Sequence, residues 1–141
     1  MKQQPFVIER VLNAPAKKVW EALTIKEKMK QWYFDIEDFK PKQGAKFQFK
    51  GGKDDRVYTH LCEIKEIIPE KKLAYSWRYE GYPGNSLVTI ELFPEGNKTK
   101  IRLTHEGLET FGDHPDFAPT NFAAGWTHII GTSLPEYLSK Q

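Results

Sequence analysis

The sequence predicts an α+β domain in which a curved antiparallel sheet wraps around one long C-terminal helix. Short segments in the middle of the chain alternate apolar and polar residues and are separated by turn residues, which is typical of antiparallel strands. Residues 121–138 instead carry apolar side chains at helical spacing. A twisted antiparallel sheet has one face to cover, and only this last segment is long enough to cover it. No linker, repeat or low-complexity stretch interrupts the chain, so residues 1–141 are expected to form a single domain.

The N-terminal part predicts one strand followed by two short helices. Residues 6–12 (FVIERVL) are rich in β-branched and apolar residues and read as the strand. Pro15 then favours a helix start, and apolar residues continue at helical spacing to Leu23. Residues 24–27 (TIKE) match a capping box, which predicts a second helix. Its apolar face would consist of Ile25, Met29 and Trp32.

The middle of the chain predicts a meander, so that the sheet has about 6–7 strands in total. Residues 51–55 (GGKDD) read as a turn, and alternation fails around Leu61–Ile64, which predicts a β-bulge. The expected strands are residues 34–38, 45–50, 56–68, 73–80, 86–93 and 99–106.

The closing segment is the most informative part of the chain. Its apolar stripe consists of Phe122, Trp126, Ile129, Ser133, Leu134, Tyr137 and Leu138. Small residues interrupt this stripe, and we expect the gaps that they leave to favour a hollow beneath the helix: Ala123, Ala124, Gly125 and Gly131. Pro135 should remove the hydrogen bond to the carbonyl of Gly131 and bend the helix.

Composition narrows the classes of partner. Twenty-one basic and 19 acidic residues give a net charge of +2, which does not support a nucleic-acid partner. No apolar run approaches the roughly 20 residues that span a bilayer, so no membrane insertion is expected. Cys62 is the single cysteine and cannot form an internal disulfide, which fits a reducing compartment and predicts a cytoplasmic location.

Catalytic, metal and cofactor signatures are absent from the sequence. Residues 113–116 (DHPD) have the residue types of a metal site, but no second histidine lies at ligand spacing, so we expect no metal. No nucleophile elbow, phosphate loop or dinucleotide fingerprint is found, and no cofactor is predicted. Cys62 lies in an apolar strand and is expected to act as a small hydrophobe. His105 shares a strand face with apolar residues, which leaves two interpretations: a buried structural histidine or a polar contact to a ligand.

Aromatic residues make up 13% of the chain and must line either a solid core or a pocket. The small residues on the closing segment favour a pocket between sheet and helix that holds an apolar or aromatic molecule. The candidate ligand-binding residues are Trp32, Phe34, Phe49, Tyr58, Trp77, Tyr79, His105, Phe122, Trp126 and Ile130.

Five short patterns recur in order along the chain. They are residues 13–15 with 19–24 (NAP and VWEALT), Trp32, Pro69 with residues 73–77 (LAYSW), residues 103–108 (LTHEGL), and residues 125–126 (GW). In these residues the chain resembles the START-like (SRPBCC, birch-pollen-allergen-like) superfamily. Within it, the chain resembles the family named after the C-terminal domain of the activator of the 90-kDa heat-shock protein ATPase.

The resemblance implies a helix-grip fold around a hydrophobic cavity, and members of the superfamily bind lipids, steroids, flavonoid-like or polyketide molecules. We therefore expect a non-catalytic protein that binds a small hydrophobic or aromatic molecule. The second hypothesis is a chaperone-associated module that modulates a heat-shock ATPase in the stress response, with the chaperone as partner. It predicts an exposed apolar or charged patch outside the cavity. The third is a cyclase- or hydrolase-type enzyme, which needs inward polar residues at reactive distances.

Overall fold

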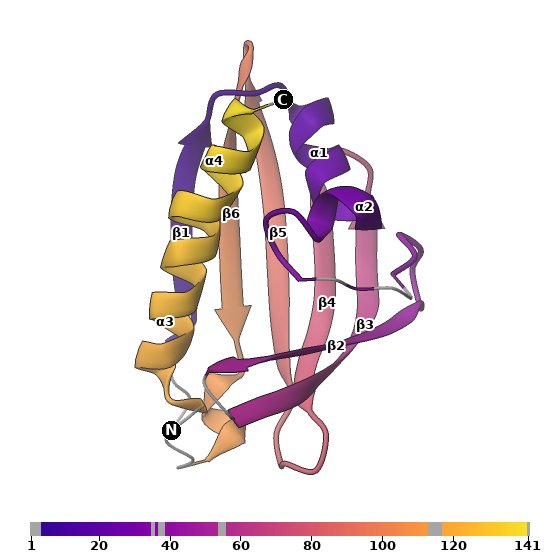
Figure 1. Cartoon of the computed structure of the whole chain (residues 1–141), viewed down its shortest axis with the longest axis vertical. Coiled ribbons are helices and arrows are strands. Elements are labelled where there is room, and N and C mark those ends of the chain that lie inside the picture. The colour runs from indigo at the N-terminus through magenta and orange to yellow at the C-terminus, as the bar shows by residue number, and fades with distance from the viewer. Residues whose placement is uncertain (1–3, 35, 37–38, 54–55, 113–116, 141) are drawn as a thin grey trace.

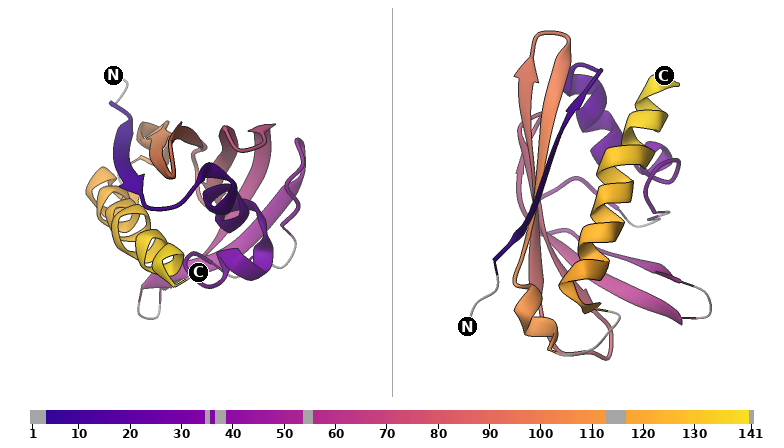
Figure 2. Two further views of the ribbon diagram at one scale, coloured as in Figure 1. Left: turned by 90° about the horizontal axis from the view of Figure 1, so that it is seen from above. Right: turned by 90° about the vertical axis from the view of Figure 1, so that its left-hand side faces the viewer.

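The computed structural model describes residues 4–34, 36, 39–53, 56–112 and 117–140. It confirms the predicted α+β architecture, with a six-stranded antiparallel sheet in the order β1-β6-β5-β4-β3-β2. The strands are β1 (Phe6–Leu12), β2 (Lys46–Lys53), β3 (Arg56–Ile68), β4 (Lys72–Tyr79), β5 (Ser86–Glu95) and β6 (Lys98–Glu106). The sheet curves around the C-terminal helical segment, which runs along its concave side (Figures 1 and 2).

Alternation sets which face of the sheet is buried. On β4, Leu73, Tyr75, Trp77 and Tyr79 are buried on the concave face, in agreement with the period-2 pattern. On β5 and β6 every second residue is buried in the same way. The interior therefore lies between the concave face and the helices, and all functional groups discussed below lie there.

The two N-terminal helices, α1 (Ala16–Thr24) and α2 (Lys26–Met29), close one end of the curved sheet (Figure 2). The expected capping box is not formed. Ile25, rather than Thr24, precedes α2, and the helix has no side-chain cap. The Thr24 hydroxyl instead donates a hydrogen bond to the carbonyl of Trp20 at 2.8 Å, which satisfies it within α1. Of the predicted apolar face, Met29 and Trp32 are buried whereas Ile25 is exposed.

The strand expected at residues 34–38 is not observed in its described part, because Phe34 and Ile36 belong to no strand. Residues 35, 37 and 38 lie outside the described residues. Residues 51–53 of the expected turn belong instead to β2, which continues to Lys53 opposite Arg56, and residues 54 and 55 lie outside the described residues. Gly51 is needed inside this strand because an added Cβ would lie 2.8 Å from the ring of Phe34.

The predicted bulge is present in β3, slightly later than expected. The pairing of β3 with β4 shifts by one residue between Ile64 and Glu66. Just before this shift the backbone N–H of Glu63 donates to the hydroxyl of Ser76 at 3.0 Å. The Ser76 hydroxyl thus accepts a hydrogen bond from a backbone N–H beside the bulge.

The closing segment consists of α3 (Pro119–His128), one π-helical turn η3 (Ile129–Ser133) and α4 (Leu134–Ser139). Its buried residues are Phe122, Trp126, Ile130, Leu134, Tyr137 and Leu138. The expected gaps do not face the interior. Ala124 and Gly125 are exposed, and the space beside Gly131 is taken by the guanidinium of Arg10 from β1. Ala124, Gly125 and Gly131 therefore leave no hollow beneath the helix, whereas Ala123 is half-buried.

Pro135 does not end the helix. It lies in the first turn of α4, directly after the π-helical turn, and Ser133 and Leu134 keep helical backbone angles. Because hydrogen bonds in a π-turn run from residue i+5 rather than i+4, the missing N–H of proline is accommodated where the pattern changes. The π-turn also shifts the helical phase. As a result Phe122, Trp126, Ile130 and Leu134, which are four residues apart, all lie on one buried face.

Candidate functional site: an apolar pocket closed by Tyr33

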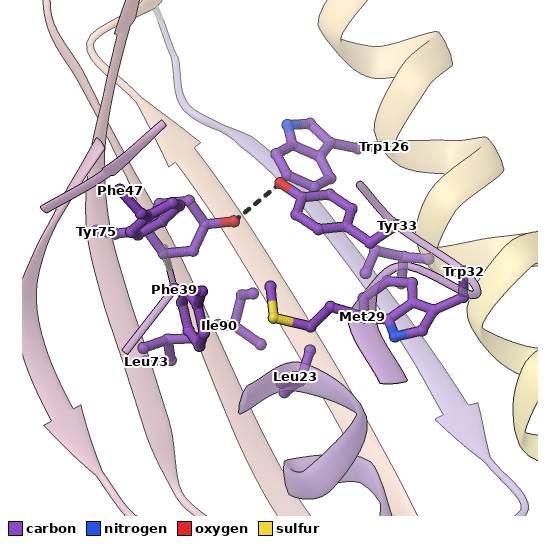
Figure 3. A pocket seen from close by; sticks show the side chains of 11 residues that line it. Leu23, Met29, Trp32, Tyr33, Phe39, Phe47, Leu73, Tyr75, Ile90 and Trp126 are labelled. Carbon is purple, nitrogen blue, oxygen red and sulfur yellow. Dashed lines mark hydrogen bonds between the residues drawn. The ribbon is translucent and has the colours of Figure 1, made fainter. Parts of the chain in front are cut away.

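An apolar pocket lies between the N-terminal helices, the sheet and the closing helix (Figure 3). The lining side chains come from all three layers. They are Leu23, Met29, Trp32, Tyr33 and Phe39 from α1, α2 and the chain after them; Phe47, Leu73, Tyr75 and Ile90 from the sheet; and Trp126 and Ile130 from the closing segment.

The pocket is nearly full. Its cavity volume is about 10 Å³. This is about the least space that one water molecule requires. A ligand larger than water can enter only if a lining side chain moves.

Tyr33 is the lining side chain best placed to move. Its side chain is only partly buried, while its hydroxyl points inward to the sheet (Figure 3). The backbone around it is held firmly: the N–H of Tyr33 donates to the carbonyl of Met29 at 2.7 Å, and the indole N–H of Trp32 donates to the carbonyl of Ala22 at 2.9 Å. The backbone at Tyr33 is thus fixed, whereas its side chain is the least buried of the pocket lining.

Two hydroxyl groups give this apolar pocket its polar contact. Tyr33 Oη and Tyr75 Oη are 3.1 Å apart and share one hydrogen bond. Burial is the main cause that raises the pKa of both phenols, that of Tyr33 well above its ordinary value, so both are neutral at physiological pH. No acid, base or cation is among the lining residues, all of which are described.

Three of the sequence-predicted site residues line the pocket: Trp32, Trp126 and Ile130. The other seven do not line it, although the rings of Phe34 and Phe49 contact that of Tyr33 with centroids 4.6 and 5.9 Å away. Phe34 and Phe49 stack with ring centroids 4.5 Å apart, and Phe49 stacks on His60 at 4.5 Å. Further along are Trp77, Tyr79, His105, Phe122 and Tyr58.

This second group forms a packed aromatic cluster. The ring of Tyr79 lies 4.0 Å from that of Phe117 with an interplanar angle of 9°. The ring of Phe122 stacks on that of Phe111 at 5.7 Å. Tyr58 meets Phe117 edge-on at 5.0 Å. The aromatic side chains thus pack against one another at this end and line the pocket at the other.

His105, for which the sequence left two interpretations open, lies in a buried chain of hydrogen bonds. It is fully buried, and its Nδ1 accepts a hydrogen bond from the indole N–H of Trp126 at 2.9 Å. Nε2 must then carry the proton and donate to the hydroxyl of Ser86 at 2.8 Å. The Ser86 hydroxyl in turn donates to the carbonyl of Trp77 at 2.8 Å. Burial lowers the pKa of His105 to about 3, so the ring is neutral and both nitrogens are engaged.

Other chemical groups offer no reactive arrangement in the described part of the chain. Cys62 is buried, and burial raises the pKa of its thiol far above the ordinary value. Among the described residues no group of three or more His, Cys, Asp and Glu side chains could hold a metal ion. Residues 113–116, where the sequence predicts no metal site, lie outside the described residues. None of the described helices combines the length and apolarity needed to cross a membrane.

Sequence reasoning missed most of the pocket lining. The residues missed are Leu23, Met29, Tyr33, Phe39, Phe47, Leu73, Tyr75 and Ile90. Leu73 and Tyr75 share a strand face with the predicted Trp77, so the same alternation could have identified them. Tyr33 carries no such signal, because it lies in an irregular segment and its partner Tyr75 is 42 residues away.

Comparison with known proteins gives a family and a fold. The model of the family described as Activator of Hsp90 ATPase homolog 1-like protein matches residues 13–139. No curated protein matches the chain. Among solved structures, protein MLL2253 from Mesorhizobium loti is 26% identical with a TM-score of 0.79, and the alignment covers 98% of each chain.

Two further structures share the fold at lower identity. DynU16, a protein of the dynemicin biosynthetic locus, is 20% identical with a TM-score of 0.80, and the alignment covers 97% of this chain but only 48% of DynU16. CalU16 from Micromonospora echinospora is 23% identical with a TM-score of 0.74, over 95% of this chain and 73% of CalU16.

Proposed function

The chain belongs to the family of Activator of Hsp90 ATPase homolog 1-like proteins, and from this premise we propose that it binds a small uncharged hydrophobic or aromatic molecule in the pocket that Tyr33 now fills. The observation that carries the proposal is the construction of the pocket. Its walls come from α1, α2, the sheet and the closing helix, and Tyr33 is the one lining side chain that is only partly buried. DynU16 comes from a biosynthetic locus, which supports a small molecule as occupant.

Displacement of Tyr33 is energetically accessible. The hydrogen bond between Tyr33 and Tyr75 contributes about 1 kcal/mol net. Burial of about 300 Å² of apolar ligand surface at about 25 cal/mol per Å² would contribute about 7 kcal/mol, before the cost of association is subtracted. These two contributions leave about 6 kcal/mol, which corresponds to a dissociation constant of about 40 µM, and the costs of association and of exposing the Tyr33 ring weaken the binding from that value.

The proposed non-catalytic role rests on the groups at the pocket. Its only titratable side chains are two neutral phenols, and His105 uses both ring nitrogens within the core. A cyclase or hydrolase mechanism would require a general acid or base within reach of the ligand.

The chaperone-binding hypothesis has no comparable support on the described surface. Exposed large apolar side chains are Val7, Val11, Ile25, Val57, Ile68 and Tyr82. They are distributed over β1, β3, the start of α2 and the loop after β4. The charged Glu9 separates Val7 from Val11 along β1.

Titration with 2-methylnaphthalene, followed by ¹H–¹⁵N NMR, tests the proposal. The indole N–H signals of Trp32 and Trp126 should shift, because both rings line the pocket, whereas the indole of Trp20 should not. Tyr33→Ala should bind the probe about tenfold more tightly, since the ligand no longer displaces a side chain. Tyr82→Ala is the matched control at an exposed tyrosine outside the pocket and should bind as the unaltered protein does. Absence of binding to both the unaltered protein and a folded Tyr33→Ala variant would contradict the proposal.

A further inference from the structure

Tyr33 occupies the pocket as a bound aromatic molecule would. Its ring lies between two indoles: the centroid of Trp32 is 5.3 Å away with an interplanar angle of 29°, and that of Trp126 is 6.2 Å away at 18°. Both arrangements are near-parallel, which is the geometry that an aromatic ring, rather than an acyl chain, exploits. The position of Tyr33 is thus a slot for a planar ring.

The inner end of this slot carries one hydroxyl. The indole N–H of Trp32 donates to the carbonyl of Ala22, and that of Trp126 donates to Nδ1 of His105. The indole nitrogen of Trp126 also points away from the pocket (Figure 3). Tyr75 Oη, by contrast, has the hydroxyl of Tyr33 as its hydrogen-bond partner within the pocket. If Tyr33 rotates out, Tyr75 Oη loses this partner inside an apolar environment, which is unfavourable unless the incoming molecule replaces it.

From this geometry we infer that the molecule bound is a neutral aromatic compound with a phenol-type hydroxyl, which replaces the Tyr33 ring between the two indoles and forms a hydrogen bond with Tyr75. This inference rests on the proposed function and specifies the ligand class for the same site. A carboxylate at the same position is disfavoured, because the lining provides no cation to compensate its desolvation. A hydrocarbon of the same shape leaves the Tyr75 hydroxyl without a partner.

Three naphthalene probes that differ only in the substituent at position 2 separate these possibilities: 2-naphthol, 2-methylnaphthalene and 2-naphthoate at pH 7. In the unaltered protein we expect 2-naphthol to bind about tenfold more tightly than 2-methylnaphthalene, since one net hydrogen bond is worth roughly that factor. We expect 2-naphthoate to bind more weakly than both. The dissociation constants are measured by NMR on the indole N–H signals of Trp32 and Trp126.

Tyr75→Phe gives the decisive comparison. The ring and the apolar contacts remain, but the hydroxyl is removed, so a bound 2-naphthol has no partner for its own hydroxyl and its preference over 2-methylnaphthalene should be lost or reversed. Tyr33→Phe keeps the ring that fills the pocket and leaves Tyr75 intact, so the preference for 2-naphthol should persist. This second variant is expected to fold, because it loses a single hydroxyl.

The outcomes distinguish this inference from the proposed function. Equal binding of 2-naphthol and 2-methylnaphthalene to the unaltered protein, or a tenfold preference that persists in Tyr75→Phe, overturns the inference and leaves the proposed function in place. Tighter binding of 2-naphthoate also overturns it. If none of the three probes shifts an indole signal in the unaltered protein, in Tyr33→Phe and in Tyr33→Ala, both are wrong.

Discussion

Trp126 donates its indole N–H to Nδ1 of His105 at 2.9 Å, and this hydrogen bond links the closing helix to β6. It also determines the tautomer of His105, because a ring nitrogen that accepts a hydrogen bond carries no proton. The proton on Nε2 then continues the chain of hydrogen bonds to Ser86 and the carbonyl of Trp77.

Substitution in this chain should destabilise the fold. His105→Ala removes a fully buried ring and leaves the indole of Trp126 without its acceptor, so we expect the free energy of unfolding to fall by about 3 kcal/mol or more. Trp126→Phe removes only the donor and part of the ring, with an expected loss of about 2 kcal/mol. Urea denaturation measures both.

Histidine ¹⁵N chemical shifts test the tautomer directly. A protonated Nε2 and an unprotonated Nδ1 are expected for His105. The reverse assignment in the folded protein would contradict the hydrogen-bond chain.

Two buried histidines should make the protein less stable in mild acid. Burial lowers the pKa of His105 to about 3 and that of His60 to about 4. The unfolded chain binds protons near pH 6.5 whereas the folded protein does not, so stability is fully present above that pH and is lost as pH falls towards the folded pKa values. Each histidine contributes about 2 kcal/mol of this loss between pH 7 and pH 5.

Urea denaturation at pH 7.5 and pH 5.0 tests this dependence. His60→Phe is the informative variant, because a phenyl ring can keep the stacking on Phe49 without a titratable group. It should lose about 2 kcal/mol less than the unaltered protein over the same pH range. An equal loss in both proteins would show that His60 is not the group responsible.

Cys62 should be chemically inert in the folded protein. It is buried, and burial raises the pKa of its thiol, so little thiolate is present at neutral pH. We expect a thiol reagent such as 5,5′-dithiobis(2-nitrobenzoic acid) to react at least about 100-fold more slowly with the folded protein than with the chain in 8 M urea. Comparable rates in the two states would indicate an accessible, reactive thiol and reopen a catalytic role.

The fold was predictable because its determinants are local. Period-2 alternation from residue 45 onwards and the helical spacing after residue 119 each depend on neighbouring residues, and both patterns are found in the structure. The family assignment was predictable for the same reason, since short patterns along the chain carry it.

The pocket was less predictable because its shape depends on long-range contacts. The orientation of Tyr33 is set by Tyr75 and Trp126, which are distant in sequence. The inferred gaps at Gly125 and Gly131 were wrong because periodicity alone does not say which neighbour covers a position, such as Arg10 beside Gly131. The π-turn at Ile129–Ser133, which shifts the helical phase, has no sequence signal apart from the proline that follows it.

Gly84 should be the least replaceable of the glycines in the turns. Its φ of +105° is unfavourable for any other residue, and an added Cβ would lie 2.6 Å from both the carbonyl oxygen of Thr110 and the ring of Phe111. Backbone strain and this clash add up, so Gly84→Ala should lower the free energy of unfolding by about 3 to 5 kcal/mol.

Gly44 provides the matched control for this substitution. It also has a positive φ, of +86°, but an added Cβ would meet nothing within 4 Å. Gly44→Ala should therefore cost only the backbone term, about 1 to 2 kcal/mol. Urea denaturation of the two variants separates the contributions: the difference between them measures the clash of residue 84 with the 3₁₀-helix η1 (Leu108–Phe111), which contains Thr110 and Phe111. Equal losses would mean that the backbone conformation alone, and not the contact with η1, makes glycine necessary at this turn.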